Sequence, residues 1–215
     1  WFHMFCLQNK VTLKTMEFVI STMNEHFQLE NFDVNLWREC VLTMVAFSTQ
    51  KGLQIGSPFI SSRRSKLLSA QPDLRKKAAL DLRSMWFSLS PKNRNMNIPS
   101  LIGSFLQVAL IDDDVVCETV MSIFFDMMEC EFNSSTPKGF PNFASAMIVQ
   151  LDCLVDEDRG GQRFREQLRR MMEMCSSDSE LYNECSKFVT VLDTLLQHLF
   201  EYREVRTSGY SVENG

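Results

Sequence analysis

The chain has 215 residues, a net charge of −5, 45% hydrophobic residues and 23% charged residues, which is a composition typical of globular proteins. The negative charge argues against nucleic acid as a partner, because phosphate binding needs concentrated positive charge. No apolar run reaches the roughly 18 residues that a membrane-spanning helix requires, so we expect any membrane contact to be peripheral.

Apolar residues recur at three- and four-residue spacing along almost the whole chain, which is the pattern of amphipathic helices. The first predicted helix covers about 7–27, and the second begins after Asp33, a residue type favoured as a helix N-cap. Gly52 and the Gly-Ser-Pro run at 56–58 mark the end of this second helix. The sequence therefore opens with two helices joined by a short turn.

A third helix is predicted after Pro72, with apolar residues along one face as far as Leu89. Ser90 and the proline after it should end this helix, and we expect the loop to continue to about Asn97. Pro99 then suits the first turn of the next helix, where a backbone N–H would have no helical partner in any case.

The second half of the chain repeats this alternation of helices and breaks. The acidic run at 112–114 should open one helix, and a loop is predicted at 133–141. Two further helices follow on either side of a charged, glycine-containing turn at 156–161. The last helix has the clearest apolar stripe, which runs from Leu181 to Tyr202.

The sequence thus predicts roughly eight or nine helices of about 12 to 25 residues each. When neighbouring helices are paired, the repeat is about 40 to 50 residues long, which is the size of HEAT and armadillo units. We therefore predict an all-α fold of armadillo/HEAT-like stacked helical hairpins, an α-solenoid fragment, with a closed helical bundle as the alternative. The predicted array is continuous over 1–205, and 206–215 form a polar tail or linker. Because the chain opens on mostly apolar residues at 1–5 without a starting methionine, we expect a piece of a larger protein.

No residue cluster predicts catalysis, a cofactor or a bound metal. The carboxylates at 112–114 are expected to cap a helix and those at 156–158 to lie in a solvated turn, because neither run has calcium-loop spacing. His3, His26 and His198 stand far apart in the sequence and belong to no zinc motif. The seven cysteines include no Cys-x-x-Cys pair and lie mostly among apolar residues, which favours buried thiols in a reducing cytoplasm. An unrelated helical enzyme would need a buried polar cluster, and no stretch indicates one.

One part of the chain concentrates basic residues and is the candidate interaction site. Its charges can contact an anionic membrane surface, where each contributes on the order of 1 kcal/mol, or a protein partner. A solvated loop and helix face is the alternative interpretation. The residues of this basic segment are Arg63, Arg64, Lys66, Arg75, Lys76 and Lys77.

Several stretches, in the same order along the chain, resemble the dedicator of cytokinesis (DOCK) family of exchange factors for Rac and Cdc42 GTPases. The most specific are LWRECVLTMVAFSTQ at 36–50 and IFFDMMECEF at 123–132. Singly these are weak apolar patterns, whereas together the stretches cover almost the whole chain. The other similar stretches lie at 81–89, 98–111, 143–168 and 188–205.

This resemblance implies a position in a parent protein of the Rac-directed, ELMO-partnered branch. The chain is similar to the helical-repeat region between a lipid-binding C2-like domain and the catalytic exchange domain, which would begin near Val205. The resemblance implies a non-catalytic scaffold that links and orients these flanking domains in a cytoplasmic protein recruited to the plasma membrane. A Rac-family GTPase and an ELMO-type adaptor would bind other parts of the parent. A protein–protein or autoinhibitory interaction module is the alternative function.

Overall fold

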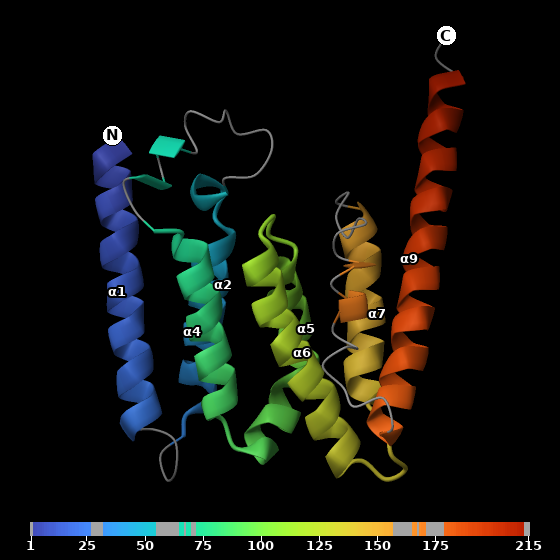
Figure 1. The fold of residues 1–215 in the computed structure, drawn as a ribbon, viewed down its shortest axis with the longest axis horizontal. Coiled ribbons are helices and arrows are strands. Elements are labelled where there is room, and N and C mark those ends of the chain that lie inside the picture. The colour runs from blue at the N-terminus through green and yellow to red at the C-terminus, as the bar shows by residue number, and fades with distance from the viewer. Residues whose placement is uncertain are drawn as a thin grey trace. The chain divides into compact units, whose positions relative to one another are not determined.

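The computed structural model describes most of the chain, and every element in the described ranges is helical (Figure 1). Within these ranges there is no strand, so the all-α prediction is confirmed. Most of the helix expected after the turn at 156–161, and most of that turn, lie outside them. The described ranges are 2–26, 32–54, 65–66, 68–69, 72–156, 165–166, 168–170 and 179–212.

The chain divides into two compact units, of which the first is Trp1–Asn97 with Ser104–Phe124 and the second is Ile98–Gly103 with Phe125–Gly215. The helices α5 and α6 each contribute residues to both units. The helical elements are α1 (Phe2–His26), α2 (Val34–Thr49), the 3₁₀ turn η1 (Lys51–Leu53), α4 (Leu74–Ser88), α5 (Pro91–Ala109), α6 (Asp114–Ser134), α7 (Pro141–Asp156) and α9 (Glu180–Val212).

Three aspartates of the first unit cap the helices that follow them. Oδ1 of Asp33 accepts hydrogen bonds from two backbone N–H groups in the first turn of α2, at 2.9 and 3.1 Å. Oδ1 of Asp113 does the same for α6, at 3.0 and 3.2 Å, and Oδ1 of Asp73 accepts from the N–H of Arg75 at 3.1 Å. These bonds satisfy N–H groups that lack helical partners and place negative charge at the positive end of each helix. The caps predicted at Asp33 and within 112–114 are therefore confirmed.

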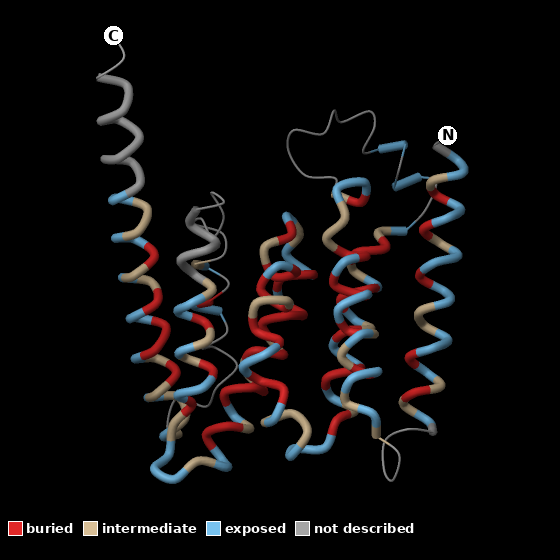
Figure 2. The backbone as a smooth tube through the Cα atoms, turned by 180° about the vertical axis from the view of Figure 1, so that it is seen from behind, coloured by how far each residue is buried: buried red, intermediate tan, exposed pale blue. Residues whose placement is uncertain are grey.

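The first unit buries its apolar stripes where α4 packs against both α1 and α2, and Figure 2 shows these buried positions in red. Trp86 is fully buried on α4, and its ring meets the ring of Phe105 edge-on with the centroids 6.0 Å apart. Packing is favoured because it removes the apolar faces of these helices from water. The buried stripe residues of the three helices include Leu13, Ile20, Met23, Trp37, Val41, Met44, Leu82 and Met85.

In the second unit, α7 packs against α9 around three phenylalanine rings. The centroid of Phe188 lies 5.5 Å from that of Phe140 and 5.7 Å from that of Phe143, with the rings edge-on. Phe143 is fully buried and the other two are nearly so, which makes the trio a tight apolar core. The buried face of α9 continues through Cys185, Val189, Leu192 and Leu196.

One boundary prediction is wrong, because the loop expected between the third and fourth helices belongs to α5, which begins at Pro91. Ser90 caps this helix, its Oγ accepting from the N–H of Asn93 at 3.4 Å. Pro99, expected in the first turn, lies inside the helix instead. The helix continues across Pro99 because neighbouring apolar residues such as Ile98 are buried, and their packing offsets the hydrogen bond that proline cannot donate.

The final helix, α9, continues to Val212, past the end of the predicted stripe at Tyr202. Tyr202 was expected on the buried face, yet it is exposed. The backbone of 206–212, which is part of the predicted tail at 206–215, is therefore helical. The division into an array over 1–205 and a linker after it stays a prediction.

Candidate functional site

Arg75 belongs to the predicted basic segment, yet it lies inside the first unit with only 1% of its surface exposed. Its guanidinium contacts both carboxylate oxygens of Asp73, with Nε 2.9 Å from Oδ1 and Nη2 2.6 Å from Oδ2. Asp113 also approaches it, with Oδ2 3.9 Å from Nη2. Burial alone would raise the pKa of Asp73, but the hydrogen bonds and charge of Arg75 outweigh burial and hold that pKa below its usual range. The structure therefore removes Arg75 from the expected surface and makes it an internal tie between the starts of α4 and α6.

The two lysines that follow Arg75 are paired with carboxylates. Nζ of Lys76 is 3.2 Å from a carboxylate oxygen of Asp113, which caps α6. Lys77 forms an ion pair with Glu17 of α1, and the hydrogen bond to Glu17 raises the pKa of Lys77 above its ordinary value. Both lysines are partly exposed, but their charges are largely balanced within the first unit.

Three members of the basic segment precede α4 in the sequence. Lys66 is exposed, whereas Arg63 and Arg64 lie outside the described residues. Among the described members, Lys66, Lys76 and Lys77 reach the surface, and the role of the segment as an interaction or membrane-facing site stays a prediction.

Among the described acids of the first unit, Asp81 on α4 has the largest pKa shift. Burial raises the pKa of Asp81 to about 6; the negative charge of Glu17 adds to the shift and the positive charge of Lys77 opposes it. Its Oδ2 atom is buried and has no hydrogen-bond partner among the described residues. Ion clusters inside a packed core produce such shifts as readily as active sites do. Because Asp81 lies where α4 packs on α1, we assign the shift to helix packing.

Metal-binding residue types are scattered through the described part of the chain. Within that part, no three His, Cys, Asp or Glu side chains lie close enough together to hold a metal ion. His3 and His198 are exposed, and the side chain of His26 lies outside the described residues. In the described ranges, no helix is long and apolar enough to cross a lipid bilayer. Thiols, rather than disulfides, are found at Cys6, Cys40, Cys117, Cys130 and Cys185.

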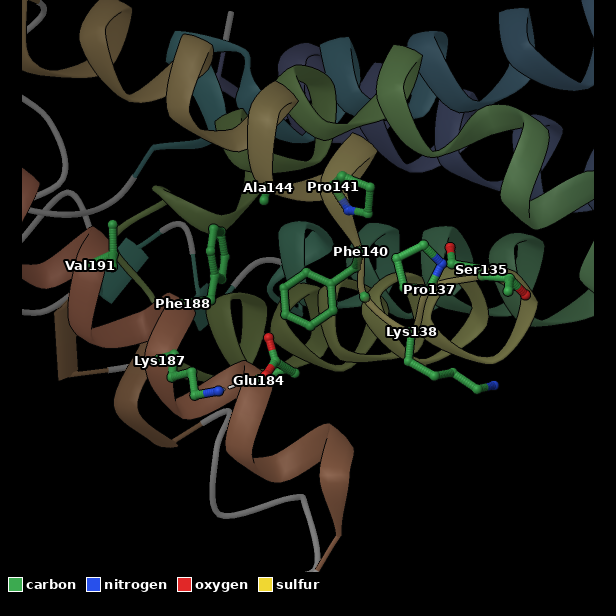
Figure 3. Close-up of a pocket in the computed structure, with 12 residues that line it drawn as sticks. Ser135, Pro137, Lys138, Phe140, Pro141, Ala144, Glu184, Lys187, Phe188 and Val191 are labelled. Atoms are coloured by element: carbon green, nitrogen blue, oxygen red, sulfur yellow. Dashed lines mark hydrogen bonds and ion pairs between the residues drawn. The ribbon is translucent and has the colours of Figure 1, made fainter.

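The second unit contains an open pocket of about 620 Å³ beside the start of α7 (Figure 3). One of its walls is a single face of α9, formed by Glu184, Lys187, Phe188 and Val191. These four residues share a face because they are spaced by three or four positions along the helix. The other wall is the loop between α6 and α7 together with the first turn of α7, and its residues are Ser135, Thr136, Pro137, Lys138, Gly139, Phe140, Pro141 and Ala144.

Glu131, near the end of α6, holds the loop wall of this pocket in place. Its side chain is 4% exposed, and its two oxygens accept the backbone N–H groups of Asn142 at 2.8 Å and Phe143 at 2.9 Å. Glu131 thus caps α7 from another helix, at the end where the helix dipole favours negative charge. The sequence predicts the loop at 133–141 but not this cap, because capping residues normally stand next to the helix that they cap.

Charged groups stand around the apolar walls of the pocket. Oε1 of Glu184 is 2.8 Å from Nζ of Lys187, and Figure 3 draws this ion pair beside the aromatic wall. Nζ of Lys138 donates to the backbone carbonyl of Asn133 at 3.2 Å and lies 5.5 Å from the ring centroid of Phe132. The lining thus combines apolar side chains with the charged groups of Lys138, Glu184 and Lys187, a composition that is common in binding pockets.

Comparison with known proteins gives one consistent result. A family model described as the dedicator of cytokinesis (DOCK) TPR region matches residues 1–171. Dedicator of cytokinesis protein 3 of Homo sapiens is 28% identical over 223 residues, covering 100% of this chain and 11% of that protein. Dedicator of cytokinesis protein 4 of Homo sapiens is 28% identical over 210 residues, covering 97% of this chain and 10% of that protein. The chain therefore spans about a tenth of the length of these curated relatives.

Proposed function

Because the chain belongs to the dedicator of cytokinesis (DOCK) family, as part of its TPR region, we propose that it is a non-catalytic scaffold within a guanine nucleotide exchange factor for Rac-like small GTPases. The observation that carries this proposal is the match of residues 1–171 to a helical-repeat region that is distinct from an exchange domain. TPR units are helix pairs that stack on their neighbours, and arrays of such pairs act as extended supports.

Buried ties between helices give this scaffold its stiffness. In the first unit, α4 packs on both α1 and α2, and Arg75 joins α4 to the cap of α6. In the second unit, Glu131 joins α6 to α7. Bending at the Glu131 joint would break charge-assisted hydrogen bonds that are largely shielded from water, which is costly. Bending at the Arg75 joint would separate the ion pair between Arg75 and Asp113, whose atoms lie 3.9 Å apart. A stiff support would hold the lipid-binding and exchange domains of the parent in a fixed relation.

The partners of the parent protein bind elsewhere in this proposal. The flanking domains are the direct neighbours of the array, whereas a Rac-family GTPase and an ELMO-type adaptor engage other parts of the parent. The parent acts in the cytoplasm and is recruited to the plasma membrane. The net charge of −5 is consistent with a region that does not itself hold the parent on an anionic surface.

Release of labelled GDP from Rac tests the non-catalytic part of this proposal. We expect this chain alone to leave release at its spontaneous rate, because the chain holds a helical-repeat region rather than an exchange domain. The parent protein is the positive control and should accelerate release. Clear acceleration by the chain alone would refute a purely supporting role.

An interaction module is the second candidate function, and the open apolar pocket of the second unit favours it. The exposed lysines of the basic segment are a separate candidate surface. Lys66→Glu tests that surface well, because it breaks no ion pair found among the described residues, whereas changes at Lys76 or Lys77 do. Weaker binding of the variant chain to anionic vesicles at an unchanged melting temperature would support the surface, and unchanged binding would remove it.

A further inference from the structure

The pocket beside α9 has apolar walls, to which two nearly buried aromatic rings and the exposed side chain of Val191 contribute. Phe140 and Phe188 line it with their ring centroids 5.5 Å apart, and Val191, which completes the α9 wall, is 55% exposed. Walls made of packed aromatic rings favour binding, because the protein loses little conformational freedom when a ligand fills the space. The volume of about 620 Å³ lies within the range of roughly 300–1,000 Å³ that ligand pockets occupy.

The residues that line the pocket include two lysines and one glutamate. Lys138 on the loop and Lys187 on α9 supply two ammonium groups, and Glu184 supplies one carboxylate. Oε1 of Glu184 already contacts Nζ of Lys187 at 2.8 Å, and Lys187 still has 72% of its side chain exposed. A ligand with an apolar group and a nearby carboxylate would therefore complement both the walls and the residual positive charge.

These features favour a peptide over a lipid surface. Two lysines opposed by one glutamate provide little attraction to an anionic membrane, where each basic residue contributes on the order of 1 kcal/mol. A peptide can place one side chain against the rings and a neighbouring carboxylate beside the lysines. Anchors of this kind, inserted in a groove beside a helix, are a common mode of peptide recognition.

We propose that this pocket is a docking site for a short segment of a partner protein that presents an aromatic or leucine anchor next to Asp or Glu side chains. The anchor lies against Phe140 and Phe188, and the carboxylates lie beside Lys138 and Lys187. The site does not depend on the scaffold role proposed above, since all the residues that line it belong to the second unit and its binding can be measured with this chain alone.

Selection of a displayed library of random short peptides on the immobilised chain tests the proposal. We expect the enriched peptides to combine a Phe, Tyr, Trp or Leu anchor with acidic neighbours. Labelled copies of them should bind the chain in fluorescence anisotropy, with an affinity that falls as salt rises, because partly exposed charges contribute. A selection that yields no binders, or binders whose shared charged residues are basic, would overturn the proposal.

Two exposed pocket residues provide variants that leave the core intact. Val191→Glu places a carboxylate in the pocket and should weaken binding of the selected peptides about tenfold or more. Lys187→Glu should weaken it about two- to fivefold, as expected for a partly exposed charge pair. The matched controls are Val149→Glu on α7, at a residue that is 64% exposed, and Lys92→Glu, at an exposed residue of α5. Neither control residue lines the pocket, so equal losses in test and control variants would overturn the proposal.

Other occupants of the pocket would give different results. Light scattering would show whether the wild-type chain forms dimers. If it does and Val191→Glu abolishes them, the pocket would be assigned to a second copy of the chain and the peptide proposal would be overturned. The wild-type chain could instead select no peptide but bind vesicles of phosphatidylcholine and phosphatidylserine. If Val191→Glu abolished this vesicle binding, the pocket would be assigned to a lipid surface and the proposal would be overturned as well.

Discussion

Replacing Glu131 with glutamine perturbs the contact that holds the start of α7 against α6. In the native protein each carboxylate oxygen of Glu131 accepts one backbone N–H, from Asn142 at 2.8 Å and from Phe143 at 2.9 Å. Glutamine keeps the shape of the side chain but offers one acceptor oxygen and one NH₂ group. One of the two N–H groups would then face another donor, and the negative charge at the N-terminus of α7 would be lost.

The size of the effect follows from the burial of these groups. A hydrogen bond to a charged group contributes about 1.5–3 kcal/mol, and a buried N–H without a partner costs about 1–3 kcal/mol. The N–H of Phe143 is buried, whereas that of Asn142 is only partly buried and can turn to water. We therefore expect the glutamine oxygen to stay with Phe143 and Glu131→Gln to lower the free energy of unfolding by about 2 kcal/mol. Glu131→Ala, which removes both acceptors, should lower it by about 3 kcal/mol.

Urea unfolding followed by circular dichroism gives these free energies, and amide hydrogen exchange reports on the two capped N–H groups directly. We expect faster exchange at Asn142 and Phe143 in Glu131→Gln and Glu131→Ala. Glu129→Gln is the matched control, since Glu129 is an exposed residue of the same helix, and it should change stability by less than about 0.5 kcal/mol. A Glu131→Gln protein as stable as the wild type, with unchanged exchange at Phe143, would refute this capping role.

Three further substitutions test the first unit. The pKa of Asp81 is raised to about 6 in the folded protein, so the stability that its protonated carboxyl contributes is lost as pH rises through that value. Asp81→Asn should therefore stabilise the chain by about 1 kcal/mol above pH ~7, after allowance for partial exposure. Below pH ~4 the substitution should have little effect. Equal effects at both pH values in urea titrations would contradict this. Arg75→Lys should cost about 2 kcal/mol, because lysine cannot make the two-pronged contact with Asp73, and an unchanged melting temperature would argue against it. Trp86→Ala should lower the free energy of unfolding in urea by about 3–5 kcal/mol, because Trp86 is fully buried. Phe87 is its exposed neighbour, and a larger loss of stability in Phe87→Ala than in Trp86→Ala would contradict this expectation.

Features that depend on neighbouring residues could be predicted from the sequence. Asp33 and Asp113 cap their helices because an aspartate reaches N–H groups two or three residues ahead of it. The apolar stripes predicted the all-α fold and the buried faces of α1 and α2, since helical periodicity is a local property. The resemblance to the DOCK helical-repeat region is also confirmed, and the matching family model describes its repeats as TPR where the sequence predicted armadillo/HEAT-like hairpins.

Features that depend on distant segments meeting in space could not be predicted in this way. Pro91 and Pro99 both carry a helix-start signal, and only the burial around Pro99 identifies it as an internal residue of α5. Arg75 is part of a basic run in the sequence, yet it is buried in the fold, where Asp113 on a later segment approaches it. The pocket requires the α6–α7 loop to lie beside α9, so none of the residues that line it was a predicted site.

Replacement of the whole array tests most directly the central claim that this region orients the flanking domains of its parent. In the parent protein, a flexible glycine–serine linker takes the place of residues 1–205, and release of labelled GDP from Rac is measured in solution and on anionic vesicles that carry Rac. We predict that the rate in solution is retained and that acceleration on the vesicles is lost, because a flexible linker fixes no orientation. Equal acceleration on vesicles by the native and linker proteins would contradict the claim.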